Sequence, residues 1–270
     1  FGFVIPDNGK LDSDIFIPEK KSMGAVTGHK VVVEITNYGE KSKSAEGRVV
    51  EILGHINDPE TDVLSVVRDL DIPVDFPDVV MAEVKNIPDE VTTKEMAGRT
   101  DLRQLQTVTI DGEDAKDLDD AITLYEENGL YKLGVHIADV SHYVRSGSAL
   151  DREAFARGTS IYYANRVIPM LPKELSNGIC SLNPEEDRLA FSAFMTFNSN
   201  AEMKKFEFRK SVIRSRVKGV YAEVNNLIAG SASEEIAVKY KEVLPEISLM
   251  KELAEKLLLN RRKRGAPEIE

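Results

Sequence analysis

The sequence predicts an α+β protein in which a small β-rich unit comes before a larger domain of mixed strands and helices. Three observations support this division. Short alternating strand patterns fill residues 1–56, prolines cut residues 57–106 into short helical pieces, and strands and helices mix over residues 107–270. A chain of 270 residues is long enough for two domains. We therefore expect a β unit, a helical connector and a mixed α/β domain, in that order.

The amino-acid composition limits the class of protein, its cellular location and the partners that it can bind. Apolar residues make up 42% of the chain and charged residues 30%, which excludes a disordered chain. No apolar run approaches the roughly 20 residues of a membrane helix, so no membrane partner is expected. The single cysteine, Cys180, cannot form an internal disulfide, which favours a reducing, cytoplasmic location. With a net charge of −11, the protein would need a locally basic path or bridging metal ions to bind a polyanion.

The first unit, residues 1–56, contains four short strand patterns. The segments FGFVIP and DIFIP flank Asp7-Asn8-Gly9, a typical hairpin turn, and HKVVVEITNYG and GRVVEILG follow. Four such strands with aromatic residues on one face suggest a small barrel or sandwich. Phe1, Phe3 and Phe16 lie at alternating strand positions. They could stack on unpaired bases or form the core of the barrel, and the pattern alone leaves both open.

In the connector and the domain that follows it, short sequence patterns predict individual helices, strands and turns. Apolar spacing predicts helices over 62–70 and 78–84, and the mixed domain is expected to begin near Thr107 with the strand TVTI. A hairpin over 121–140 should turn at Asn128-Gly129. Further predictions are a helix over 148–158 capped by Ser148, a strand pair over about 188–213, and helices beginning at Ser233 and Pro245.

The densest chemical feature is the segment TIDGEDAKDLDDAI, which lies between two predicted strands. Six carboxylates fall within residues 111–120, yet Leu118 interrupts them and an apolar strand resumes at Ala121. We therefore expect this loop to lie against the core. Carboxylates held close together raise one another's pKa unless a cation neutralises them.

A set of oxygen ligands suits Mg²⁺, with Mn²⁺ as the alternative. A calcium loop of the EF-hand type is excluded by spacing, because Lys116 and Ile122 stand where that loop needs Gly and Glu. A purely solvated acidic loop remains the alternative to a metal site. A carboxylate-bound metal without nearby thiolate or imidazole ligands indicates phosphate chemistry, in which one or two ions act on phosphoryl oxygens.

Several long motifs in one order carry a resemblance to a known family. The acidic segment is followed by HIADVSHYV, LDREAFARGTSIYY, VIPMLPKELSNGICSLNPEEDRLAFS and FRKSVIRSRV. This series resembles the RNB catalytic domain of the ribonuclease II/ribonuclease R family, and its ribonuclease R branch most closely. FGFVIPDN and SDIFIP resemble the RNA-binding strands of a cold-shock domain, an OB-like β-barrel that precedes the catalytic domain in that family.

The resemblance implies a Mg²⁺-dependent, hydrolytic 3′→5′ exoribonuclease that degrades single-stranded RNA and releases nucleoside 5′-monophosphates. The four aspartates of the family match Asp111, Asp117, Asp119 and Asp120. Among these metal ligands, Asp119 stands at the position most critical for cleavage. The tyrosine that stacks on the 3′-terminal base corresponds to Tyr162, or to Tyr163 if the register is shifted by one.

One departure from the family is serious. Nothing in the chain matches the arginine motif, similar to TSPIRRY, that the second half of the family's catalytic domain carries. We therefore expect the RNB domain to be incomplete and the chain to be inactive by itself. The barrel is expected to be incomplete as well, because four strand patterns are one short of a five-stranded barrel. The protein is expected to be monomeric. A basic cluster over 204–218 could line an RNA path, with Arg214 and Arg216 on one strand face, or could be an ordinary solvated surface.

The alternative to an enzyme is a non-catalytic RNA-binding module or scaffold. All four aspartates are present, which favours the enzyme. His136 and His142 have no partner at ligand spacing and are interpreted as structural, and Cys180 is assigned no reactivity.

Overall fold

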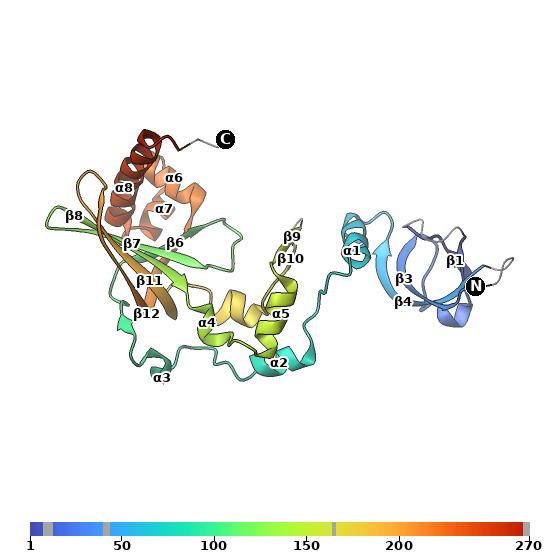
Figure 1. The fold of residues 1–270 in the computed structure, drawn as a ribbon. Coiled ribbons are helices and arrows are strands. Elements are labelled where there is room, and N and C mark those ends of the chain that lie inside the picture. The colour runs from blue at the N-terminus through green and yellow to red at the C-terminus, as the bar shows by residue number, and fades with distance from the viewer. Residues whose placement is uncertain (8–12, 40–43, 164–165, 267–270) are drawn as a thin grey trace. The chain divides into compact units, whose positions relative to one another are not determined.

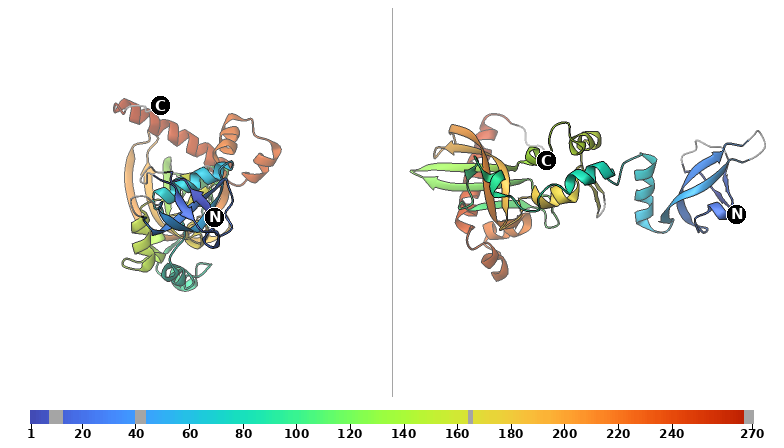
Figure 2. Two further views of the ribbon diagram at one scale, coloured as in Figure 1. Left: turned by 90° about the vertical axis from the view of Figure 1, so that its right-hand side faces the viewer. Right: turned by 90° about the horizontal axis from the view of Figure 1, so that it is seen from below.

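The computed structural model describes residues 1–7, 13–39, 44–163 and 166–266. The chain divides into two compact units (Figure 1). The first comprises Phe1–Asp75 with Tyr163–Arg166, and the second comprises Phe76–Tyr162 with Val167–Glu270. Figure 2 shows the same chain in two further orientations. Within the described ranges, no helix is both long and apolar enough to cross a membrane.

The first unit is built on one sheet with the strand order β1-β2-β4-β3. Its elements are β1 (Gly2–Val4), β2 (Ile15–Ile17), η1 (Glu19–Lys21), β3 (His29–Asn37), β4 (Glu46–His55) and α1 (Pro59–Asp69). Ile15, Ile17 and Val49 form its buried core. All four predicted strands are confirmed, whereas the predicted turn at Asp7-Asn8-Gly9 lies largely outside the described residues.

The second unit contains a larger sheet with the strand order β11-β8-β7-β6-β12-β5. Its strands are β5 (Thr100–Asp101), β6 (Thr107–Asp111), β7 (Asp120–Glu127), β8 (Leu130–Ala138), β11 (Asp187–Phe197) and β12 (Met203–Val220). Two short strands, β9 (Ile161–Tyr163) and β10 (Arg166–Ile168), pair separately. The helices that follow Phe76 are α2 (Asp78–Val84), α3 (Thr93–Met96), α4 (Val140–Tyr143), α5 (Ala149–Arg157), the π-helical turn η2 (Glu174–Ile179), α6 (Tyr221–Ala229), α7 (Glu234–Lys239) and α8 (Leu244–Lys263).

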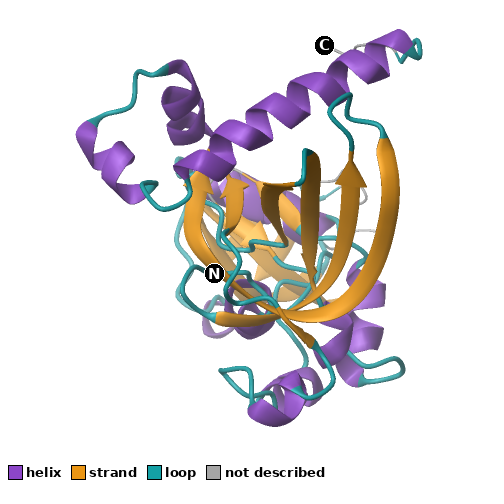
Figure 3. Cartoon of the chain, turned by 90° about the vertical axis from the view of Figure 1, so that its left-hand side faces the viewer, coloured by secondary structure: helices purple, strands orange, loops and turns teal. Residues whose placement is uncertain are grey.

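The long strand β12 closes this sheet on itself. Its first part pairs antiparallel with β11 over Asp187–Phe197, and its last part pairs parallel with β6 over Thr107–Asp111. The register shifts between Ser215 and Val217, where the strand passes from one neighbour to the other. The strands β6, β7, β8, β11 and β12 therefore form a closed barrel, and their curvature is visible in Figure 3.

A layer of polar side chains crosses the inside of this barrel. Hydrogen bonds join Thr107 to Thr123 (2.9 Å), Thr123 to His136 (2.9 Å), His136 to Ser192 (2.7 Å) and Ser192 to Ser211 (2.5 Å). All five residues are at most 2% exposed, so the layer lies in the buried interior of the barrel. A neutral imidazole suits this chain because it offers one donor and one acceptor. Burial lowers the pKa of His136 to about 4, which keeps the ring neutral at pH 7.

Helices cover the outside of the barrel in two groups. Helices α2 and α5, together with η2, pack on Leu189 and Val212. The C-terminal helices pack on the opposite end, where Leu253 of α8 contacts Leu124 and Phe197. The apolar stripe predicted for the last helix is thus a core contact for Leu253, whereas Leu258 is 42% exposed.

Local predictions in this unit are confirmed. Helix α2 coincides with the predicted helix over 78–84, and the hairpin turns at Asn128 and Gly129, both with positive φ (53° and 72°), as the favoured two-residue turn requires. The hydroxyl of Ser148 accepts from the Asp151 amide at the start of α5. The predicted strand pair is longer than expected, and α6 was not predicted.

The buried histidine makes stability depend on pH. The folded-state pKa of His136 lies near 4 and the unfolded value near 6.5, so stability is complete above about pH 6.5 and falls as the pH drops toward 4. The loss should reach at most about 3 kcal/mol. We expect His136→Gln to remove this component. Urea unfolding of both proteins from pH 7.5 to 4 measures it as the difference between the two pH profiles. Equal profiles would contradict the prediction.

Candidate functional site

The acidic loop connects β6 to β7 at one end of the barrel. Asp111 is the last residue of β6 and Asp120 the first residue of β7. Between them, Leu118 is 1% exposed and packs in a cluster with Ala121 and Leu182. Burial of this leucine stabilises the loop by ~2 kcal/mol. The expectation that the loop lies against the core is confirmed.

Main-chain hydrogen bonds attach the loop on the side of η2. The amide of Leu118 donates to Ser181 Oγ at 3.0 Å, and the Ser181 hydroxyl donates to the carbonyl of Lys116 at 2.9 Å. The amide of Leu182 donates to the carbonyl of Leu118 at 2.8 Å. Ser181 is fully buried, so these bonds are shielded from water. The backbone of the loop is therefore fixed, although most of its carboxylates remain open to solvent.

Two further elements attach the same loop. The Nζ of Lys218, on β12, donates to the carbonyls of Glu113 (2.9 Å) and Ala115 (2.6 Å). The amide of Ala138, at the end of β8, donates to the carbonyl of Asp119 at 2.9 Å. Three separate segments thus converge on one loop, which is typical of a preorganised site.

The structure brings the four predicted aspartates into electrostatic contact. Partial burial raises the pKa of Asp111, and the charges of Asp120 and Asp117 raise it further, while Lys218 opposes them. Partial burial likewise raises the pKa of Asp119, with added repulsion from Asp117, Asp120 and Asp111. The loop therefore stores like-charge repulsion that a cation would relieve.

The donor set fits a hard divalent cation. All four groups are carboxylates, and burial together with the neighbouring carboxylate charges raises the pKa of Asp111 and Asp119, as expected of oxygen ligands that share an ion. In the part of the chain that the structure describes, no three His, Cys, Asp or Glu side chains are close enough to hold a metal ion as they stand. Binding would therefore require the carboxylates to draw together above a backbone that is already fixed.

Tyr162 lies beside this loop. Its hydroxyl donates to Asp117 Oδ2 at 2.7 Å, and this bond raises the pKa of the phenol. The side chain is 64% exposed, so its ring face is accessible to a ligand. Of the two tyrosines that the sequence suggested, Tyr162 and Tyr163, it is Tyr162 whose hydroxyl contacts one of the four aspartates.

The three predicted aromatic residues of the first unit form a cluster. Phe3 pairs with Phe16 across β1 and β2, and the ring centroids of Phe1, Phe3 and Phe16 lie 5.7–6.1 Å apart. Phe1 is 81% exposed and Phe3 is 55% exposed. Their rings therefore lie on the surface, and the alternative of a barrel core is wrong for these two.

Arg214 and Arg216 face the same hollow of about 250 Å³, together with Arg103 and Gln104. Arg214 forms an ion pair with Asp187 at 2.7 Å, and Arg216 donates to the carbonyl of Arg103 at 2.8 Å. Both guanidinium groups thus already have protein partners. Their assignment to an RNA path stays a prediction.

Sequence reasoning missed Ser181 as a support of the site. It lies 63 residues beyond Leu118, and its surroundings in the sequence carry no sign of this contact. Lys218 was counted only as part of the basic cluster. Cys180, also near this region, is buried, and burial raises the pKa of its thiol to about 12, in agreement with the absence of reactivity.

The stored repulsion predicts that neutralising Asp119 stabilises the metal-free chain. Because the folded state raises the pKa of this carboxyl, the penalty is absent below about pH 4 and grows as the pH rises. We expect Asp119→Asn to increase the free energy of unfolding at pH 8 by up to ~1 kcal/mol, as suits a solvent-screened group. Urea unfolding with a chelator present measures the change.

Asp114→Asn is the matched control, because Asp114 is exposed in the same loop and does not act on Asp119. If both substitutions gave the same change, or if Asp119→Asn destabilised the chain at pH 8, the described electrostatics would be wrong.

The chain matches two domain families. The RNB domain matches residues 99–270 and the cold shock domain matches residues 3–77. Ribonuclease R of Thermotoga maritima is 46% identical over 269 residues, which cover 98% of this chain and 38% of that protein. Ribonuclease R of Escherichia coli is 40% identical over 265 residues, covering 98% of this chain and 32% of the relative. The chain thus spans about a third of the length of these relatives.

Solved structures agree with this assignment. Mycoplasma genitalium RNase R in complex with double-stranded RNA has a TM-score of 0.80 at 26% identity, over 97% of this chain and 47% of that chain. Yeast Ssd1, described as a pseudonuclease, has a TM-score of 0.63 at 20% identity, over 99% of this chain and 33% of that chain, and shows the fold alone. The order of a cold-shock unit and an RNB domain is confirmed. The chain therefore belongs to the RNB-domain family of ribonucleases, the ribonuclease II/ribonuclease R family.

Proposed function

We propose that the protein acts as a 3′→5′ exoribonuclease that hydrolyses single-stranded RNA to nucleoside 5′-monophosphates with the help of Mg²⁺. The observation that carries this proposal is the group of four aspartates held at the barrel end by Leu118, Ser181 and Lys218. Relatives called ribonuclease R, at 40–46% identity, support the same activity. A cytoplasmic location is proposed with it, on the strength of the single, buried cysteine.

The aspartates would hold the cation and the attacking water. Asp111, Asp117 and Asp120 are proposed as metal ligands, and Asp119 as the ligand on which cleavage depends most. A divalent cation, when bound, lowers the pKa of its water and polarises the phosphoryl oxygens. The fixed backbone of the loop keeps these four carboxylates in one part of the structure, so that less ordering would be needed when a cation binds.

Tyr162 would seat the 3′-terminal nucleotide. Its exposed ring offers a stacking surface, while its hydroxyl bond to Asp117 fixes the ring beside the carboxylates. An exonuclease needs such a platform, because the terminal diester must be held next to the cation while it is attacked.

We infer that this chain by itself cleaves RNA slowly or not at all. No arginine motif like that of the family's second half is present, and losing one preorganised charge donor costs about 10²–10³-fold in rate. Incubation of the chain with 5′-labelled single-stranded RNA and Mg²⁺ tests this. We expect no ladder of shortened products, and processive shortening would contradict the inference.

The role of Asp119 can be tested separately from cleavage by this chain. We expect Asp119→Asn to weaken Mn²⁺ binding at least ~10-fold in calorimetry, because one ligand charge is lost. RNA binding in chelator should stay within about twofold, since a stacking contact does not need this carboxylate. In the whole protein, the same change should abolish cleavage. Persistent cleavage would show that Asp119 does not have the proposed role.

The stacking role of Tyr162 has its own variants. Tyr162→Ala removes the ring and should weaken binding of a short single-stranded RNA by roughly 5–100-fold, which is the range for one stacked base. Tyr162→Phe keeps the ring and loses only the Asp117 bond, so its affinity should stay near that of the parent chain. Fluorescence anisotropy in chelator measures both. Equal affinity of the alanine variant and the parent would exclude stacking.

A non-catalytic RNA-binding module is the second candidate. The yeast pseudonuclease shows that this fold occurs in a protein described as lacking nuclease activity, so the fold alone does not decide. The four aspartates and their anchored loop favour the enzyme. Absence of Mn²⁺ binding by a chain that still binds RNA would favour the module.

A further inference from the structure

Three phenylalanines form an exposed cluster on the outer face of the barrel. Phe191, on β11, and Phe206 and Phe208, on β12, are 46%, 59% and 60% exposed. The rings of Phe191 and Phe208 stack in parallel, with centroids 5.9 Å apart and 10° between planes, and Phe206 meets Phe208 edge-on at 5.8 Å. Exposing three large aromatic side chains together is costly in water, so the cluster indicates a binding surface.

Strand register connects this cluster to the catalytic end of the barrel. Phe191 lies opposite Ile137, which lies opposite Asp120. Directly paired residues project to the same face of a sheet, so one row of side chains runs from Asp120 across Ile137 to Phe191. On the other side, Phe191 lies opposite Lys210 of β12. The row therefore begins at a proposed metal ligand and ends at a lysine.

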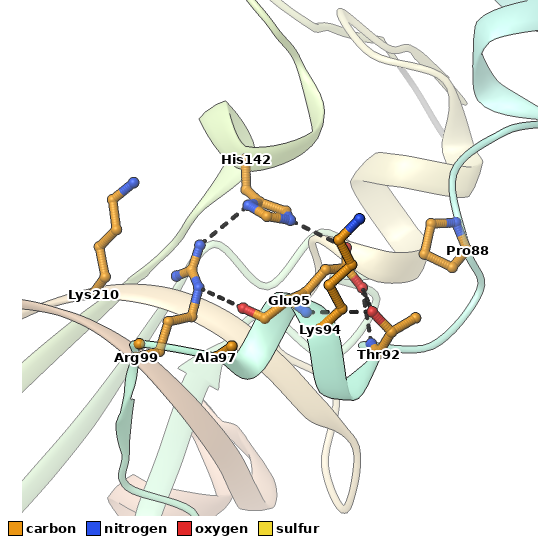
Figure 4. Close-up of a pocket in the computed structure, with 9 residues that line it drawn as sticks. Pro88, Thr92, Lys94, Glu95, Ala97, Arg99, His142 and Lys210 are labelled. Carbon is orange, nitrogen blue, oxygen red and sulfur yellow. Dashed lines mark hydrogen bonds and ion pairs between the residues drawn. The ribbon is translucent and has the colours of Figure 1, made fainter.

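Lys210 borders a hollow of about 580 Å³, which α3 and the residues after it line together with His142 of α4. Figure 4 shows Lys94 and Lys210 at its edge, on either side of Arg99 and His142. Arg99 donates to Asp139 Oδ2 at 2.6 Å, and both side chains are at most 5% exposed. The wall of the hollow is therefore a fixed, neutralised network.

The two lysines differ from the arginine between them. Among the described residues, no hydrogen bond and no ion pair within 4 Å joins Lys94 Nζ or Lys210 Nζ to a partner, although the charge of Lys210 helps to lower the pKa of the buried Asp139, which Arg99 already pairs with. Nearby cations of β12 do have partners, since Arg209 pairs with Glu207 and Lys204 with Glu202. In a protein with a net charge of −11, Lys94 and Lys210 border one hollow, and Lys210 also lies opposite Phe191, so this part of the surface carries local positive charge.

We propose that Phe191, Phe206 and Phe208, with Lys94 and Lys210, form a second binding surface for single-stranded RNA on the RNB barrel. The rings offer faces on which bases stack, and the lysines lie where the phosphates of the same strand would pass. The observation that favours RNA over a protein partner is that stacked aromatic rings lie directly beside Lys210, whose ammonium group has no hydrogen-bonded partner among the described residues. The proposal rests on the proposed function for its ligand, and it adds a surface outside the aspartate site.

Substitution of the rings tests the stacking. Phe191→Leu with Phe208→Leu keeps an apolar surface but removes the aromatic faces, and it should weaken binding of a fluorescein-labelled 12-nucleotide oligo(A) RNA at least ~5-fold. Phe155→Leu is the matched control, because Phe155 is 89% exposed on α5 and outside the cluster. Fluorescence anisotropy in chelator excludes any contribution from cleavage.

Substitution of the lysines tests the phosphate contacts. Lys94→Gln with Lys210→Gln should reduce the slope of log affinity against log salt by about 1.4, at ~0.7 for each phosphate contact on a single strand. Lys241→Gln, an exposed lysine on the C-terminal side, should leave the slope unchanged. Circular dichroism confirms that each variant is folded before its affinity is measured.

Three results of these binding experiments would contradict either the second RNA-binding surface or the proposed function. Parent-like affinity and salt slope in the folded leucine and glutamine variants would overturn this proposal while leaving the aspartate site intact. If the leucine variant kept its RNA affinity but lost a self-association seen for the parent in sedimentation, the surface would be a protein interface and the proposal would be wrong. Failure of the parent chain to bind RNA at all would instead contradict the proposed function.

Discussion

The attachment of one acidic loop to the end of a closed barrel is the constraint on which the site depends. Four aspartates within ten residues repel one another, and this repulsion adds to the effect of burial in raising the pKa of Asp111 and Asp119. Burial of Leu118 and its hydrogen bonds to Ser181 and Leu182 oppose that repulsion. The free energy gained by packing and hydrogen bonding of the loop against the barrel offsets the electrostatic repulsion among its carboxylates.

Closure of the barrel explains why distant segments can meet at this loop. Strand β12 pairs first with β11 and then with β6, so it carries Lys218 to the loop that follows β6. Inside the barrel, the buried polar layer centred on His136 links five strands by hydrogen bonds. Such a layer makes strand register specific, because a slip of one residue would leave its hydroxyls unpaired. Gly134 leaves room for the imidazole, since a Cβ there would lie 2.9 Å from its Nε2.

Much of this could be predicted from the sequence, because the signals are local. Alternation predicted the strands, Asn128-Gly129 the turn, Ser148 the helix cap, and Leu118 the inward position of the acidic loop. The rest depends on contacts between distant residues. Neither the register shift near Ser215 that closes the barrel nor the bond from Leu118 to Ser181, across 63 residues, has a local signature. For the same reason the partner of Arg214, Asp187 on the neighbouring strand, was not foreseen.

The four aspartates on this fixed loop are proposed to bind a divalent cation. Anomalous diffraction from crystals soaked in Mn²⁺ tests this proposal most directly, because manganese is located independently of any activity. We expect an anomalous peak surrounded by carboxylate oxygens of Asp111, Asp117, Asp119 and Asp120, with the loop backbone in the conformation described above. A fully soaked crystal with no peak among these four residues, or with manganese bound only elsewhere, would contradict this proposal.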